Sequence, residues 1–232
     1  MDGAHPVTPT VRLAALDMAG TTVSDDGVVE RAFRRALAAV GGAGDASPVG
    51  DPDEFVKRTM GQSKIAVFTE LFGGDTGAAH RANAAFESAY DDAVDRGEVV
   101  ALPGAAQTMA DLRAAGVRVC LTTGFAPATR DRILDALGWT GSVDLALSPA
   151  DAGRGRPWPD MILTAVIRLE IGDVRQVAVV GDTTSDLLAG WRAGAGIVAG
   201  VLTGAHRRPD FEAVPHTHIL DSVTDLSGLV LS

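Results

Sequence analysis

The sequence predicts an α/β protein, with a Rossmann-like parallel sheet core and an inserted all-helical cap domain. Two observations predict this fold. From about residue 100 onward, short apolar runs alternate with segments of helical periodicity, which is typical of a parallel sheet covered on both faces. A further apolar run at 11–17 stands alone and is followed by a long stretch of helical pattern. We therefore assign residues 1–23 and 100–232 to the core and 24–99 to the cap.

The core elements are expected where runs rich in valine and leucine alternate with helical periods. Strands are predicted at 11–17, 117–123, 143–148, 176–182 and 196–202. Helices are predicted between them at 104–116, 126–139, 158–172 and 185–196. Pro127 and Pro159 support two of these helices, because the first turn of a helix tolerates proline.

The inserted segment has no strand pattern. Helices are predicted in it at 28–41, 63–73 and 78–97, and the glycine, proline and aspartate content of 41–54 predicts a loop. An insertion after the first strand of a parallel sheet lies over the carboxyl edge, where such sheets bind ligands. This placement makes the segment a candidate cap over a site.

The bulk composition limits the partners. The 232 residues carry a formal net charge of −10, which repels nucleic acid and anionic membranes, so an anionic substrate has to meet a local positive site. No apolar run reaches membrane-spanning length. Cys120 is the single cysteine and is expected to be buried, and the first ten residues lack the features of a secretory signal. We therefore expect a cytoplasmic protein without an internal disulfide.

Polar side chains gather where the predicted strands end. They are Asp17, Thr122, Thr123, Arg156, Asp182 and Asp186. Carboxylates clustered at one edge repel one another unless a cation lies among them, and hard oxygen ligands suit Mg²⁺. Hydroxyls and an arginine would then hold a phosphoryl group. Taken singly these signals are weak, since Asp186 could equally be a helix N-cap and Thr-Thr-Gly could be a plain turn.

The ordered combination resembles a known family. "DMAGTT", "LTTG", "RPWPD" and "GDTTSD", in this order and with a helical insertion after the first, resemble the haloacid dehalogenase superfamily of phosphoryl-transfer enzymes. Ala19 stands where the family usually has a second aspartate, and Arg156 where it usually has a lysine. Both departures, together with a "MGxxK" stretch at Met60–Lys64, are shared by the phosphonatases (phosphonoacetaldehyde hydrolases) and their phosphonatase-like relatives.

The resemblance implies a role for each matched residue. Asp17 would attack phosphorus, and Lys64 would form an imine with a substrate carbonyl. The implied cofactor is Mg²⁺, held by Asp17, the backbone carbonyl of Ala19, Asp182 and, in support, Asp186. The implied substrate-binding residues are Thr122, Thr123, Arg156 and, in the wall of the site, Met60.

The departures from the family pattern fit one chemistry. An ester phosphatase needs a general acid for its alkoxide leaving group, and Ala19 cannot supply one. Cleavage of a C–P bond releases a carbanion instead, and an iminium at Lys64 would take up its electrons. The positive end of a helix dipole and desolvation under the cap would both favour the neutral, nucleophilic amine. The alternative is that Lys64, like Lys57, is ordinary helix surface.

Several functions stay open. Phosphonatases have a histidine where this chain has Val67, and an aromatic hydroxyl where it has Phe125, which puts the identity of the substrate in question. The first hypothesis is Mg²⁺-dependent cleavage of the C–P bond of a 2-oxo-alkylphosphonate. The second is a phosphomonoesterase acting on a small metabolite such as phosphoglycolate, which Ala19 disfavours. The third is a non-catalytic phosphate-binding or regulatory relative, which the retained Asp17, Asp182 and Arg156 disfavour.

Two further expectations concern partners and metals. The resemblance suggests a homodimer through the cap helices, acting on a small-molecule phosphonate or phosphate. His216 and His218 are interpreted as surface residues rather than metal ligands, because no further cysteine or histidine lies near them in the sequence.

Overall fold

The computed structural model describes residues 11–24, 26–41 and 48–231. Its sheet has six strands, all parallel, in the order β3-β2-β1-β4-β5-β6. They are β1 (Leu13–Asp17), β2 (Arg118–Thr122), β3 (Leu145–Leu147), β4 (Val177–Gly181), β5 (Ile197–Val201) and β6 (His218–Leu220). The first strand therefore lies at the centre, between β2 and β4. Residues 1–10, where no secretory signal is expected, lie outside the described residues.

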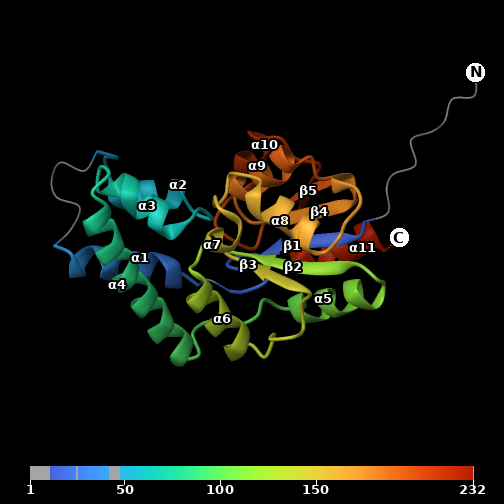
Figure 1. Ribbon diagram of the computed structural model, residues 1–232, viewed down its shortest axis with the longest axis horizontal. Helices are drawn as coiled ribbons and strands as arrows, with labels where there is room; N and C mark the ends of the chain where they lie inside the picture. Colours follow the sequence, from blue (N-terminus) through green and yellow to red (C-terminus); the bar gives the residue numbers. More distant parts are fainter. Residues whose placement is uncertain (1–10, 25, 42–47, 232) are drawn as a thin grey trace, which may run out of the picture.

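Helices cover both faces of the sheet (Figure 1). On one face lie α5 (Ala105–Ala114), α6 (Pro127–Ala136) and α11 (Leu226–Val230). On the other lie α8 (Asp160–Arg168), α9 (Thr184–Ala193) and α10 (Arg208–Glu212). Shorter pieces are α7 (Pro149–Ala152) and the 3₁₀ turns η1 (Val174–Gln176) and η2 (Val223–Asp225). Each of the five strands and four core helices predicted from the apolar pattern is present within, or one residue outside, its predicted range.

Two elements depart from the predictions. The edge strand β6 was not predicted, because it has three residues and no apolar run marks it. Helix α2 (Pro52–Arg58) begins inside the segment predicted as a loop. Asp51 caps this helix, since its carboxylate accepts hydrogen bonds from the N–H groups of Asp53 (2.8 Å) and Glu54 (3.4 Å). The loop prediction for 41–54 is therefore wrong at its C-terminal end.

The described part of 24–99 is helical and lies to one side of the sheet (left in Figure 1). Besides α2, this helical segment contains α1 (Val28–Ala39), α3 (Lys64–Leu71) and α4 (Thr76–Asp95). Phe33 joins three of these helices, with its ring centroid 4.8 Å from those of both Phe68 and Phe86. Helix α4 also packs on α6 of the core, where Arg132 forms an ion pair with Asp95. That the helical segment acts as a cap stays a prediction.

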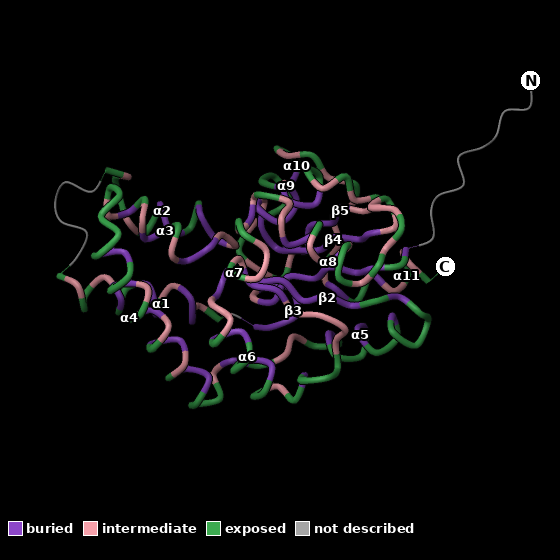
Figure 2. The backbone as a smooth tube through the Cα atoms, viewed as in Figure 1, coloured by how far each residue is buried: buried purple, intermediate pink, exposed green. Residues whose placement is uncertain are grey.

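The buried residues of the core are concentrated in the strands of the sheet (Figure 2). All residues of β1 and β4 are buried, as expected for strands covered on both faces. Cys120 is buried in β2, as expected. Among the described helices, none is both long enough and apolar enough to cross a membrane.

Candidate active site

The parallel register of the sheet brings polar groups from different strands to one edge. Asp17 ends β1 and lies opposite Thr122, which ends β2. Asp182 directly follows β4, which pairs with β1 on the other side. Because parallel strands present their carboxyl ends at the same edge, these groups meet where such sheets bind ligands.

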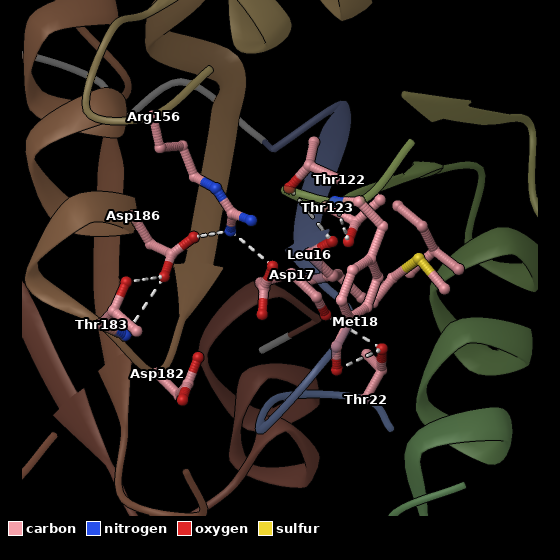
Figure 3. A network of polar contacts seen from close by, with 12 residues as sticks. Leu16, Asp17, Met18, Thr22, Thr122, Thr123, Arg156, Asp182, Thr183 and Asp186 are labelled. Atoms are coloured by element: carbon pink, nitrogen blue, oxygen red, sulfur yellow. Dashed lines mark hydrogen bonds and ion pairs between the residues drawn. The ribbon is translucent and has the colours of Figure 1, made fainter. Parts of the chain in front are cut away.

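Asp17, Asp182 and Asp186 form a buried carboxylate triad (Figure 3). One carboxylate oxygen of each lies within 4.8 Å of the others. Across the described ranges, this is the one group of three or more histidine, cysteine, aspartate or glutamate side chains close enough to hold a metal ion. The structure thus brings together the three aspartates that the sequence singled out, and His216 and His218 do not join them.

Arg156 lies between two members of the triad (Figure 3). Its Nη1 contacts the Oδ1 atoms of both Asp17 and Asp186. The sequence indicated only a ligand for phosphoryl oxygens here, so the direct pairing with the triad is an addition. The Nε of Arg156 is buried and has no hydrogen-bond partner among the described residues. Arg156 therefore has donor capacity that the triad does not use and that an incoming anion could occupy.

Asp186 uses its two oxygens differently. It is the third residue of α9, and its Oδ2 accepts hydrogen bonds from the N–H (3.1 Å) and Oγ1 (2.5 Å) of Thr183. Its Oδ1 contacts Arg156. The helix-capping role considered from the sequence is present, but it occupies one oxygen and leaves the other to the triad.

The triad is short of positive charge. Burial raises the pKa of Asp17 to about 7; Arg156 opposes this rise, and Asp186 adds to it. Burial, followed by the charges of Asp17 and Asp186, raises the pKa of Asp182 well above its ordinary value, even though its Oδ2 accepts a hydrogen bond from the N–H of Ala205 at 2.7 Å. A cation among these oxygens would relieve the repulsion. Carboxylates are ligands that Mg²⁺ prefers, so the residues present fit this ion.

The two threonines after β2 differ in position. Thr123 lines a cavity beside the triad, and its Oγ1 accepts a hydrogen bond from the N–H of Phe125 at 3.2 Å. The hydroxyl of Thr122 is buried, 3.5 Å from the carbonyl oxygen of Leu16. Thr123 is therefore the better placed of the two to contact a ligand in the cavity.

The loop that carries Arg156 is held by α9. Arg192, near the end of this helix, donates from Nη1 to the carbonyl of Pro157 at 2.7 Å. Trp158 packs against two guanidinium groups, with its ring centroid 4.4 Å from the Cζ of Arg154 and 5.2 Å from that of Arg192. No motif in the sequence indicated this clamp. It links the helix that begins beside Asp186 to the loop that positions its partner.

The loop before α3 packs tightly on the core. Gly61 has a φ of 79°, which favours glycine, and a Cβ there would overlap Oγ1 of Thr183. A Cβ on Gly124 would overlap the carbonyl oxygen of Gln62. The backbone N–H of Lys64 donates to the carbonyl of Gly124 at 3.2 Å. These contacts hold the helical segment against the carboxyl edge of the sheet.

Lys64 is a buried lysine. It is the first residue of α3 and is only 6% exposed. Its Nζ lies 5.6 Å from the ring centroid of Phe33, 6.0 Å from that of Phe86 and 5.5 Å from that of Phe125. The surface alternative does not hold for this residue, whereas Lys57 is exposed.

A cavity of about 30 Å³ joins Lys64 to the triad. Residues from the core and from the helical segment line it together, among them Asp17, Arg156, Asp182, Met60, Lys64 and Phe125. One water molecule needs roughly 10–15 Å³, so the cavity has room for only a few small groups. The cavity is therefore small, and residues of both the core and the helical segment bound it.

The family of the chain follows from a match to family models. Residues 11–194 match the model of haloacid dehalogenase-like hydrolases. Because this match covers most of the sequence, the chain belongs to that family of hydrolases. The predicted α/β class with a Rossmann-like parallel sheet is confirmed.

Individual relatives show more limited likeness. Phosphonoacetaldehyde hydrolase of Pseudomonas fluorescens strain Pf0-1 is 33% identical over 112 residues, which are 48% of this chain and 41% of that protein. The match therefore spans less than half of the relative's length.

Two solved structures cover the chain more fully. A phosphonoacetaldehyde hydrolase-like protein from Oleispira antarctica has a TM-score of 0.80 at 22% identity, over 100% of this chain and 95% of that one. A protein described as a predicted phosphoglycolate phosphatase, from Haemophilus somnus, has a TM-score of 0.76 at 18% identity, over 94% of this chain and 97% of that one. At such identities these two structures establish a shared fold alone.

Proposed function

We propose that the chain is a Mg²⁺-dependent hydrolase that cleaves the C–P bond of a small 2-oxo-alkylphosphonate. The observation that carries this proposal is the burial of the Lys64 amine in the same small cavity as Asp17. A buried amine beside a substrate carbonyl can form an imine, a step that ester hydrolysis does not require. The likeness to phosphonoacetaldehyde hydrolase of Pseudomonas fluorescens supports the same substrate class.

In this proposal the first bond forms at Lys64. Its neutral amine adds to the substrate carbonyl, and loss of one water gives an imine, which takes up a proton to become an iminium. The Asp17 carboxylate then attacks phosphorus. The C–P bond breaks, and its electron pair moves into the iminium, which becomes an enamine.

Two hydrolyses complete the cycle. The enamine takes up a proton at carbon, and water hydrolyses the resulting iminium, releasing the aldehyde or ketone and a proton and freeing Lys64 as the neutral amine. A second water hydrolyses the aspartyl-phosphate to phosphate and regenerates Asp17. One water leaves and two enter, so the net reaction is hydrolysis by one water.

The remaining site residues bind and orient. Arg156, through its buried Nε, and Thr123 bind the phosphoryl oxygens, and Asp186 holds Arg156 in place. Bound at Asp17, Asp182 and the carbonyl of Ala19, Mg²⁺ would offset negative charge on the phosphoryl group. Met60 forms part of the wall. The helical segment acts as a cap that excludes water, and the homodimer through it stays a prediction.

A second candidate is a phosphomonoesterase for a small phosphorylated metabolite such as phosphoglycolate. The fold shared with the Haemophilus somnus protein supports it, and the same Asp17 and metal site would serve it. Against it stands Ala19, which leaves the alkoxide of an ester without the usual general acid.

Borohydride trapping tests the proposal. With phosphonoacetaldehyde as substrate, borohydride should inactivate the enzyme and leave a covalent adduct on the peptide that contains Lys64. Lys64→Arg cannot form the imine and should lose C–P cleavage by several orders of magnitude while it still folds and binds Mg²⁺ and phosphate. The matched variant Lys57→Arg should behave like the wild type.

Three results would overturn the proposal. One is a label on Lys57, and another is C–P cleavage that survives Lys64→Arg. The third is hydrolysis of phosphate esters at rates on the order of 10 s⁻¹, typical of enzymes on their own substrates, without any cleavage of phosphonates. This third result would establish the phosphomonoesterase instead.

A further inference from the structure

We propose that an aromatic wall around the Lys64 amine, formed by Phe33, Phe86 and Phe125, sets the specificity of the site. Of these three residues, Phe125 lines the cavity itself. It admits phosphonates whose carbonyl carries hydrogen or methyl as its second substituent and excludes those that carry a carboxylate there. This inference rests on the proposed function and narrows the substrate class of the same site.

The wall is continuous and firmly supported. All three rings are buried, and their centroids are 4.8 Å apart for Phe33 and Phe86 and 6.1 Å apart for Phe86 and Phe125. Each lies 5.5–6.0 Å from the Nζ of Lys64. Tyr90, itself fully buried, packs on the far side, 4.5 Å from Phe125 and 6.1 Å from Phe86. These contacts hold the rings in place and leave little room beside the Lys64 amine for a larger group.

The aromatic wall favours a positive charge on the substrate and disfavours a negative one. The face of an aromatic ring carries partial negative charge and attracts a cation within about 6 Å. An iminium on Lys64 would be stabilised there. A carboxylate attached to the same carbonyl carbon would be desolvated against ring faces, which is costly unless it finds a partner.

The cavity offers such a carboxylate no free cation. Of the described residues that line it, only Lys64 and Arg156 are basic. The nitrogen of Lys64 is used in the imine, and Arg156 contacts Asp17 and Asp186 and faces the phosphoryl end. Val67, one turn after Lys64 on α3, is buried and apolar. The carbonyl end of the site is thus built for a small uncharged group.

The test compares three phosphonates that differ only in the substituent on the carbonyl: phosphonoacetaldehyde (hydrogen), 2-oxopropylphosphonate (methyl) and 3-phosphonopyruvate (carboxylate). Their affinities are measured with Mg²⁺ by competition against inorganic phosphate, which reports binding whether or not the C–P bond is cleaved. The first two should bind within tenfold of each other, and the third at least 100-fold more weakly. Binding of 3-phosphonopyruvate within tenfold of the aldehyde would overturn the inference.

Two substitutions at Phe125 test whether the wall causes the discrimination against the carboxylate. Phe125→His adds a donor to the wall and should reduce the discrimination against the carboxylate at least tenfold, whereas Phe125→Leu keeps the position apolar and should preserve it. Equal losses of discrimination in both variants would mean that bulk alone matters, which would overturn the assignment. If Phe125→His does not fold, Phe33→His on α1 replaces it, with Phe33→Leu as its control.

The binding measurements test the aromatic wall and the trapping experiment tests the proposed function, so either idea can be refuted without the other. Absence of a borohydride adduct and of phosphonate cleavage would refute the proposed function, while the binding ratios would still report on the wall. Conversely, an adduct on Lys64 together with ready acceptance of 3-phosphonopyruvate would leave the proposed function intact and refute the wall.

Discussion

Replacing Asp17 by asparagine tests the charge imbalance of the triad. Asparagine keeps the shape of the side chain but cannot ionise. Burial raises the pKa of Asp17 from 3.8 to about 7, so between these values the folded protein holds a proton that the unfolded chain has lost. The stability due to this proton is fully present below pH 3.8 and is lost as the pH rises through about 7.

The size of the effect follows from the two pKa values. Between pH 5 and pH 8 the wild type should lose about 2.5 kcal/mol of unfolding free energy from this group, or about 5–10 °C in Tm for a chain of this length. Asp17→Asn lacks this contribution. The difference in unfolding free energy between the two proteins should therefore change by at least that amount, because the substitution also removes the charge that raises the pKa of Asp182. The variant should be relatively more stable at pH 8.

Urea unfolding in EDTA across this pH range measures the difference. Asp221→Asn, at an exposed position, is the control and should differ from the wild type by a constant amount. Saturating Mg²⁺ should flatten the pH dependence of the wild type, because the ion replaces the proton among the carboxylates. A wild-type minus Asp17→Asn difference that stays constant within about 0.5 kcal/mol in EDTA would refute the reasoning.

Three further variants test other parts of the site. Asp182→Asn should weaken Mg²⁺ binding in calorimetric titration, with activity partly restored by excess Mg²⁺; unchanged affinity would remove Asp182 from the metal site. Ala19→Asp should lower C–P cleavage by crowding the site and adding negative charge beside the phosphonate, and a faster C–P rate would contradict this. Gly61→Ala should destabilise the fold by more than about 1 kcal/mol, because its φ is 79° and its Cβ would overlap Thr183. Gly74→Ala, at a φ of 90° with open space around it, should lower the unfolding free energy by less. Equal losses in the two variants would show that backbone strain, and not the overlap with Thr183, causes the loss.

The core was predictable because its signals are local. Each buried parallel strand is a short apolar run, and each intervening helix shows its own period, so both can be read without knowing the fold. The edge strand β6 escaped prediction because it has few residues and little apolar pattern. Helix α2 as a whole was not predicted, because Asp51 and Pro52, which begin it, also occur in loops.

The site was predictable only in part. The three aspartates could be grouped because parallel strands present their carboxyl ends together. The pairing of Arg156 with two of them depends on where a loop lies in space, and no spacing in the sequence encodes it. The rings of Phe33 and Phe86 read as ordinary core positions of amphipathic helices, and only the packing of α1 against α4 reveals that Lys64 lies among them.

The hydrogen bond from the Lys64 N–H to the Gly124 carbonyl joins the helical segment, which carries Lys64, to the core, which carries Asp17. Phe33 and Phe86 belong to the helical segment, whereas Phe125 and Gly124 belong to the core. If the helical segment swings outward, this bond breaks and the Lys64 amine moves away from the phosphoryl end of the site. Phe33 and Phe86 then separate from Phe125. In the proposed mechanism the electron sink would then be assembled anew in every turnover and would exist only while bulk water is shut out. An intermediate with a labile C=N bond would in this way be protected until the products leave.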